Sequence, residues 1–212
     1  MRKTLVLALA LTTILALIVS PLPTAAQEKK DMATEAMPMA PPPPLADDFF
    51  TWMIGEWDGW TTSSMGKSEE WQKIEWGLDK QFTIMHYTAK TTEMNPEFMK
   101  GMMESAKMSK ADMDKMKNMV YKGMGVMTLN PMNNEFAGHW FDNWRATSKG
   151  TGKREGNIIT TTWESPMGTE ARTIEKVSED KMVMTFKMKD PTGKETEGRT
   201  EFIRKKAGPK KT

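Results

Sequence analysis

Methionine is the residue type whose number and spacing in this chain come closest to a chemical site. The sequence contains 22 methionines and no cysteine. Between residues 92 and 119, methionines recur at helical spacing, at Met99, Met102, Met103, Met113, Met116 and Met119. Thioether sulfur is a soft ligand that favours Cu(I), and methionine sulfoxide can be reduced back to methionine. The segment is therefore a candidate for Cu(I) binding or for scavenging of oxidants.

The same methionines also suit a purely structural role. Only three leucines follow residue 26, at Leu45, Leu78 and Leu129, so methionine replaces leucine as a flexible core filler. Five lysines lie in the same segment, at Lys100, Lys107, Lys110, Lys115 and Lys117. Because their charge disfavours a bound cation, we predict packing as the main role and keep the two chemical roles as alternatives.

The two histidines are not predicted to form a metal or catalytic site. His139 has the strand parity of Glu135, and His86 has that of Lys90, so both are expected on outward faces of separate strands. The carboxylates are also expected outside, and no nucleophile stands at the spacing that covalent catalysis requires. We therefore predict no catalytic residue and no cofactor.

Short runs rich in threonine, valine, isoleucine and aromatic residues predict a protein built from strands. The runs cover residues 56–64, 69–77, 81–90, 120–129, 135–142, 154–163, 169–177, 181–189 and 195–204. Turn-forming residues separate several of them, as in Asp190-Pro191-Thr192-Gly193. A meander of nine or ten short strands normally curls into a barrel, because closure removes the sheet edges.

Residues 92–119 interrupt this rhythm with helical signals. Asn95-Pro96-Glu97 is a typical helix start, and Ser109-Lys110-Ala111-Asp112 resembles a capping box. We predict a helical hairpin that is inserted between two strands and covers a mouth of the barrel. The predicted fold class is all-β, a single antiparallel barrel of about ten strands with a short N-terminal helix and this inserted hairpin.

Alternation along the strands assigns an interior to the barrel. In residues 181–189, the lysines share one face and the methionines the other, which places the methionines inside. The candidate interior wall consists of Tyr121, Met127, Met182, Met184, Phe186 and Phe202. Barrels of this strand number can enclose one small ligand, so we predict a non-catalytic protein that binds a small apolar molecule. A purely structural barrel, filled by its own side chains, is the alternative.

The stretch WMIGEWDGW at 52–60 predicts how the barrel closes. Asp58 is expected outside, which turns Trp57 inward, and Arg204 has inward parity at the end of the last strand. A closed barrel pairs its first and last strands, so Trp57 and Arg204 are expected to stack as a cation–π pair. Gly55 is expected to supply the sharp bend from helix to strand.

Several stretches of the chain resemble known proteins. The helix in ADDFFTWMIG, the Gly55-Glu56-Trp57 after it and the arginine that ends the last strand resemble the calycin pattern of lipocalins and related barrels. The domain is more closely similar to an uncharacterised bacterial family, domain-of-unknown-function family fifteen-seventy-nine. The matching stretches are MIGEWDG (53–59), YKGMGVMTLNPMNNEF (121–136), GHWFDNW (138–144), SPMGTEARTIEK (165–176) and TEFIR (200–204). The resemblance implies a calycin-like antiparallel barrel and supplies no activity.

The ends of the chain predict export. Residues 1–26 combine Arg2 and Lys3 with an uncharged apolar run and small residues up to Ala26, as a secretory signal peptide does. We predict a disordered proline-rich linker at 27–45, the barrel domain at 46–204 and a basic tail at 205–212. The mature protein is expected in the periplasm or outside the cell, without a membrane span. The formal charge of +2 comes from interspersed signs, which disfavours nucleic-acid binding.

Overall fold

Ten antiparallel strands close into a barrel in the computed structural model of the protein, which describes residues 42–105 and 107–206. The strands are β1 (Gly55–Ser63), β2 (Gly66–Gly77), β3 (Phe82–Met94), β4 (Val120–Asn130), β5 (Glu135–Asp142), β6 (Thr147–Glu155), β7 (Ile158–Ser165), β8 (Gly168–Ser178), β9 (Lys181–Lys189) and β10 (Glu195–Arg204). The helices are α1 (Asp48–Met53), α2 (Pro96–Ser105) and α3 (Lys110–Lys117). The predicted signal peptide, most of the predicted linker and the end of the basic tail lie outside the described residues.

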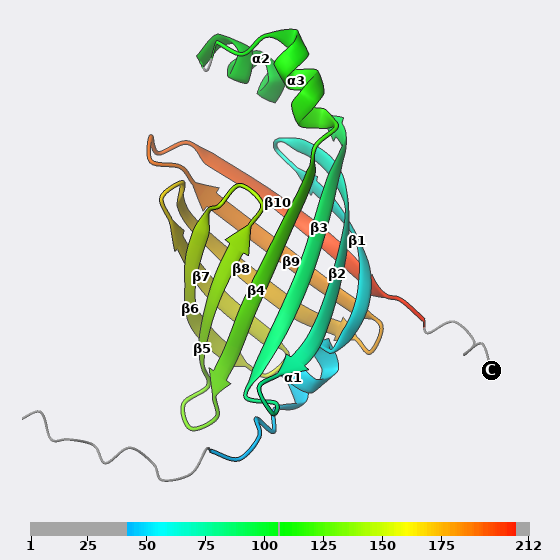
Figure 1. Ribbon diagram of the computed structural model, residues 1–212, viewed down its shortest axis with the longest axis vertical. Helices are drawn as coiled ribbons and strands as arrows, with labels where there is room; N and C mark the ends of the chain where they lie inside the picture. The colour runs from blue at the N-terminus through cyan, green and yellow to red at the C-terminus, as the bar shows by residue number, and fades with distance from the viewer. Residues whose placement is uncertain (1–41, 106, 207–212) are drawn as a thin grey trace, which may run out of the picture. The chain divides into compact units, whose positions relative to one another are not determined.

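Each strand pairs with its neighbours in sequence, and β1 pairs with β10 to close the ring. This meander has no free edge, which is the physical reason for closure. The predicted fold class, a single all-β antiparallel barrel of about ten strands with a short N-terminal helix and an inserted helical hairpin, is confirmed (Figure 1). None of the helices in the described parts of the chain is long and apolar enough to cross a membrane.

One strand differs from the sequence prediction. Residues 154–163 were predicted as a single strand, but the chain turns within them at Gly156, where φ is 57°, and so divides β6 from β7. β6 carries no large apolar side chain, because its inward positions include Gly150 and Gly152. A Cβ at Gly150 would come within 2.8 Å of the Trp163 ring, and one at Gly152 would collide with the β7 backbone. The Trp163 ring and the β7 backbone therefore occupy the space in which inward apolar side chains of β6 would otherwise lie.

The core lies at the end of the barrel that α1 covers. Asp47 caps α1 by accepting a hydrogen bond from the Phe50 amide at 2.9 Å. The helix buries four large side chains, Phe49, Phe50, Trp52 and Met53, against inward residues of the strands such as Ile74 and Ile159. Burial of this apolar surface is the main stabilising contribution to the barrel.

The packed chain begins earlier than the predicted domain boundary at residue 46. Leu45 is 8% exposed and belongs to the core, and its amide donates to the carbonyl of Lys80 at 2.9 Å. The Gln81 side chain also donates to the carbonyl of Pro42 at 2.8 Å. The end of the proline run is therefore packed against the barrel. Leu45 adds apolar area to the core, and the backbone of residues 42–45 forms hydrogen bonds with the β2–β3 turn.

The closing seam joins the two ends of the sheet to α1. Trp57 pairs with Arg204 in the register of β1 and β10, and the guanidinium carbon lies 4.0 Å from the centroid of the Trp57 ring. Arg204 Nη1 donates to the Ile54 carbonyl at 2.8 Å. Gly55 has φ of 134°, and a Cβ there would stand 2.9 Å from Arg204 Nη1. Only glycine fits this bend, because any larger residue here would strain the backbone and displace the guanidinium of Arg204.

The inserted hairpin stands beyond the opposite end of the barrel from α1 (Figure 1). The capping box is present: Ser109 accepts from the Asp112 amide, and the Asp112 side chain accepts from the Ser109 amide. α3 packs against β3, and Phe98 of α2 lies 5.6 Å, centroid to nitrogen, from Lys194 in the β9–β10 turn. These contacts tie the hairpin to separate parts of the barrel rim.

Candidate functional site

The interior of the barrel differs between its two halves. Next to α1, the inward side chains are buried and packed. Next to the hairpin, several inward side chains remain half-buried: Tyr87, Tyr121, Trp140, Glu170, Arg172, Met184 and Phe186. The side chains of Arg172 and Glu170 are 24% and 22% exposed although they point into the barrel. Solvent therefore reaches the interior in this half, which we call the lumen.

Glu70 on β2 is the most deeply buried carboxylate of the lumen, at 8% exposure. Its Oε1 accepts hydrogen bonds from the hydroxyls of Thr61 and Ser68. Its Oε2 is buried and has no hydrogen-bond partner of ordinary geometry within the described residues, although the Tyr87 hydroxyl is close enough to lower the pKa of this carboxyl. Burial raises the pKa of Glu70, and the hydroxyls of Thr61, Tyr87 and Ser68 offset only part of this effect.

Arg172 on β8 occupies the wall opposite β3 in the order of strands around the barrel. Its Nε and Nη2 both lie 2.6 Å from Oε1 of Glu170, and its guanidinium carbon lies 5.7 Å from the Trp163 ring centroid. Burial alone would lower the pKa of Arg172, but the charge of Glu170, with smaller contributions from Tyr87 and Glu70, raises it. Glu170 therefore holds Arg172 as a cation within the lumen.

Aromatic rings form the wall between β3 and β5. The ring centroid of Tyr87 lies 6.0 Å from that of Tyr121 and 5.8 Å from that of Trp140. Trp140 Nε1 donates to the Tyr121 hydroxyl at 2.8 Å, and this hydroxyl donates to Asp142 Oδ2 at 3.3 Å. Burial raises the pKa of Tyr121 to about 12 and that of Tyr87 well above its ordinary value, so both phenols stay neutral at physiological pH.

Glycines on the barrel wall make room for two inward tryptophans, the half-buried Trp140 of the lumen and Trp163, which belongs to the core. A Cβ at Gly125 would stand 2.9 Å from the Trp140 ring, and a Cβ at Gly123 would overlap that ring. Gly150 stands in the same relation to Trp163, at 2.8 Å. The indoles can therefore lie close against the wall, where a larger residue would push them towards the centre of the lumen.

The predicted interior wall is divided between the two halves. Tyr121, Met184 and Phe186 face the lumen and are half-buried. Met127, Met182 and Phe202 also face inward, but they lie in the packed half with exposures of 4%, 2% and 1%. The first three are therefore the ones that a molecule in the lumen could contact. Gly55, Trp57 and Arg204 lie at the seam next to α1.

The expectation that the carboxylates lie on outward faces is wrong for Glu70, Glu170 and Asp142. Sequence parity could have found the first two. In β2, the buried Ile74 places Glu70 on the inward face, and in β8 the buried Ile174 does the same for Arg172 and Glu170. Charged residues that share strand parity with buried apolar residues are the signal that the prediction did not use.

The hairpin methionines differ widely in burial. Met113 is 3% exposed, Met99, Met102 and Met116 are half-buried, and Met103 and Met119 are 43% and 40% exposed. Both histidines are exposed, and His86 Nε2 lies 3.6 Å from Glu75 Oε1. Within the described residues, no group of three or more histidine or acidic side chains is placed to hold a metal ion. Packing, Cu(I) binding and oxidant scavenging by the hairpin methionines stay predictions.

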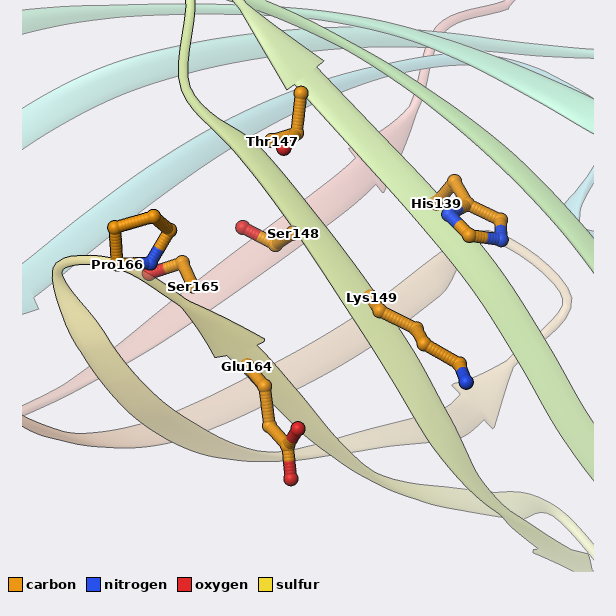
Figure 2. A pocket seen from close by; sticks show the side chains of 7 residues that line it. All are labelled: His139, Thr147, Ser148, Lys149, Glu164, Ser165 and Pro166. Carbon is orange, nitrogen blue, oxygen red and sulfur yellow. The ribbon is translucent and has the colours of Figure 1, made fainter.

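Hollows on the outer surface of the described residues differ from the lumen in chemistry, as two of them show. A recess of about 350 Å³ lies over β5, β6 and β7, where His139, Lys149 and Glu164 emerge from neighbouring strands without converging (Figure 2). Ser165 in this recess uses its hydroxyl within the β7–β8 turn. A groove of about 1450 Å³ runs along the outside of β4 to β7 beside residues 42–46. Neither hollow gathers side chains with a shared chemical task.

The comparisons with known proteins concern the fold. No family model and no curated protein matches the sequence. The structure is similar to that of Rv2717c from M. tuberculosis, with a TM-score of 0.50 and 10% identity over 74% of this chain and 94% of that chain. It also aligns with the S-type phycobiliprotein lyase CPES from Guillardia theta, with a TM-score of 0.49 and 14% identity over 76% and 92% of the two chains. The similarity to Rv2717c concerns the fold alone.

Proposed function

We propose that this protein is a non-catalytic binding protein, and that it takes a small molecule with an apolar body into the lumen. The observation that carries the proposal is the partial exposure of side chains that point inward, above all Arg172 at 24%. A barrel filled by its own side chains would bury these groups as completely as it buries Trp57 at the other end, which is 0% exposed.

The chemistry of the lumen walls suits such a ligand. Met184 and Phe186 supply apolar surface, and a methionine side chain adapts to an irregular shape. The aromatic wall of Tyr87, Tyr121 and Trp140 adds flat faces for a ring or chain. A closed barrel of this strand number has room for one small molecule between such walls.

The proposal includes export and family membership. The signal-peptide pattern of residues 1–26 supports cleavage after Ala26 and a location in the periplasm or outside the cell. The order of the matching stretches from MIGEWDG to TEFIR supports membership of family fifteen-seventy-nine. Intact-mass measurement of the exported protein tests the first point: a mature chain that begins at Gln27 is expected, and a full-length chain in the membrane fraction would contradict it.

Binding is tested with N-phenyl-1-naphthylamine, a neutral apolar probe whose fluorescence rises in an apolar site. We expect saturable binding, and we expect Met184→Trp to abolish it because the larger ring occupies the lumen. Thr185→Trp is the matched control, since the neighbouring side chain is exposed on the outward face, and it should bind the probe normally. Equal binding by both variants, or none by the parent protein, would contradict the proposal.

Native mass spectrometry of protein purified from its own host identifies what the lumen carries. A bound organic mass is expected. A copper adduct under reducing conditions, with no organic mass and no binding of the probe, would instead favour the methionines of the hairpin as the functional element.

A further inference from the structure

Glu70 is unusual because one of its oxygens lacks a partner deep inside the barrel. Across the described residues, only two buried side-chain atoms lack a hydrogen-bond partner, Glu70 Oε2 and Arg154 Nε. Arg154 lies at the α1 end, where its Nη1 is 3.2 Å from Asp47. Glu70 lies on the lumen side of the core, at 8% exposure. A buried acceptor without a donor is costly, so this atom marks a place where a bound molecule would gain a hydrogen bond.

The charges on the inward faces around Glu70 favour a cation over an anion. Three carboxylates, Glu70, Glu170 and Asp142, face inward in this half, against the guanidinium of Arg172. That guanidinium already donates a hydrogen bond to Glu170 through Nε and forms an ion pair with it through Nη2, so it offers little to an incoming anion. Asp142 is also occupied, because it accepts from Tyr121 and from the amides of the β5–β6 turn. The buried Oε2 of Glu70 is therefore the acceptor that a bound cation could use.

The rings near Glu70 add a second favourable interaction for a cation. Tyr87 borders Glu70 and stands 5.8 Å from Trp140, centroid to centroid. Trp163 already has the Arg172 cation over its ring at 5.7 Å. Organic ammonium groups are attracted to such aromatic faces, and the attraction is stronger where water is displaced.

We propose that Glu70 is the recognition residue of the lumen, and that the molecule it recognises is an organic amine: an apolar body that carries one protonated, hydrogen-bond-donating nitrogen. This inference rests on the proposed function. The ammonium would donate to Glu70 Oε2 and lie against the Tyr87 ring, while the apolar body would contact Met184 and Phe186. Arg172 acts at a distance, holding Glu170 away from the ligand.

Three dansyl probes of matched size test this inference. Dansylcadaverine carries a primary amine, N-butyl dansylamide is neutral, and 5-(dansylamino)pentanoic acid carries a carboxylate. We expect the full-length mature protein to bind the amine about tenfold more tightly than the neutral probe, as one charge-assisted hydrogen bond would give. The carboxylate probe should bind most weakly.

The variant Glu70→Gln should lose the tenfold preference and bind the neutral probe as before, because glutamine keeps the shape and removes the charge. Glu69→Gln is the control, since the adjacent side chain is exposed on the outward face. A fall in amine affinity at acid pH, with unchanged neutral-probe affinity, is a second readout of the same carboxylate. The titratable groups near Glu70 on other strands are Tyr87 and Arg172. The polar side chains from β1 and β10 are the hydroxyls of Thr61 and Thr200, which do not titrate.

The outcomes separate the inference from the proposed function. If the neutral probe binds but the amine has no advantage, or if Glu70→Gln keeps the advantage, the amine assignment is overturned and the binding function stands. If the carboxylate probe binds best, the assignment of Glu70 is overturned in favour of Arg172. If no probe binds, both are overturned.

Discussion

The guanidinium carbon of Arg204 lies 4.0 Å from the centroid of the Trp57 ring, and the two residues face each other where the last strand meets the first. Arg204 also donates to three main-chain carbonyls, those of Trp52 at 2.5 Å, Ile54 at 2.8 Å and Glu179 at 3.0 Å. One side chain therefore joins the closing strand pair, the end of α1 and the β8–β9 turn.

Replacing Arg204 by lysine should destabilise the barrel even though the charge is kept. A lysine ammonium cannot donate in three fixed directions or stack as a plane, so carbonyls of the α1 end lose their partners. We expect the free energy of unfolding to fall by about 1–3 kcal/mol in urea denaturation. Arg199→Lys on the same strand is the control, since Arg199 is exposed and forms a surface ion pair with Glu201, and its effect should stay within about 0.5 kcal/mol.

Trp57 should be the most costly residue of the seam to truncate. It is 0% exposed, and its Nε1 donates to the Met53 carbonyl at 2.9 Å. Trp57→Ala should lower the free energy of unfolding by about 3–5 kcal/mol, as for other buried large aromatics. Trp60→Ala is the comparison, because Trp60 lies on the same strand with 53% exposure. Equal losses for the two variants would mean that the seam does not hold the barrel closed.

The stability of the protein should depend on pH through Glu70. Its pKa is raised above the ordinary 4.5 by burial, so the folded protein holds this proton more tightly than the unfolded chain. The stabilisation that comes from the proton on Glu70 is therefore fully present below the ordinary pKa and is lost as pH rises through the raised pKa. Glu70→Gln should leave the free energy of unfolding nearly unchanged at pH 4 and raise it by about 1 kcal/mol at pH 8. Destabilisation at both pH values would show that the carboxylate supports the fold.

Removal of the hairpin should leave the barrel folded. Strands β3 and β4 pair from Lys90 and Val120 onwards, below the hairpin, so deletion of residues 96–117 with a Gly-Gly link keeps their register. We expect far-ultraviolet circular dichroism typical of strands and a cooperative thermal transition. We also expect N-phenyl-1-naphthylamine to dissociate faster in stopped-flow measurements, because one cover of the lumen is gone. An unfolded product would place the hairpin in the core instead.

The architecture was accessible from the sequence because alternation and turn chemistry are local signals. Eight of the nine predicted strands each correspond to one observed strand, whereas residues 154–163 span the turn between β6 and β7. The parity of Asp58 placed Trp57 inside, opposite Arg204. The strand that escaped prediction is β6, whose inward glycines leave no apolar pattern. The inward glycines of β6 lie against Trp163, a residue of the next strand. The pattern of residues 147–155 alone therefore does not predict a strand.

The polar side of the lumen was less accessible for a different reason. An inward Glu70 contradicts the simple rule that charges face water, and its acceptability depends on hydroxyls from Thr61 and Ser68 and on the distant Arg172. The two hydroxyls come from β1 and β2, which are close in sequence, but the charge of Arg172 comes from a strand far along the chain. The division between packed and accessible interior is likewise related to α1, which covers one end of the barrel and adds four large side chains to the core there.

The glycines behind Trp140 and Trp163 make the width of the lumen adjustable in small steps. A methyl group at Gly125 or Gly150 would move an indole inward while the hydrogen-bonded frame of the strands stayed in place. Larger residues at these positions would narrow the lumen further, and smaller residues in place of the tryptophans would widen it. Selection, natural or in the laboratory, can therefore retune the size of the accepted molecule without redesigning the seam, the core or the position of Glu70.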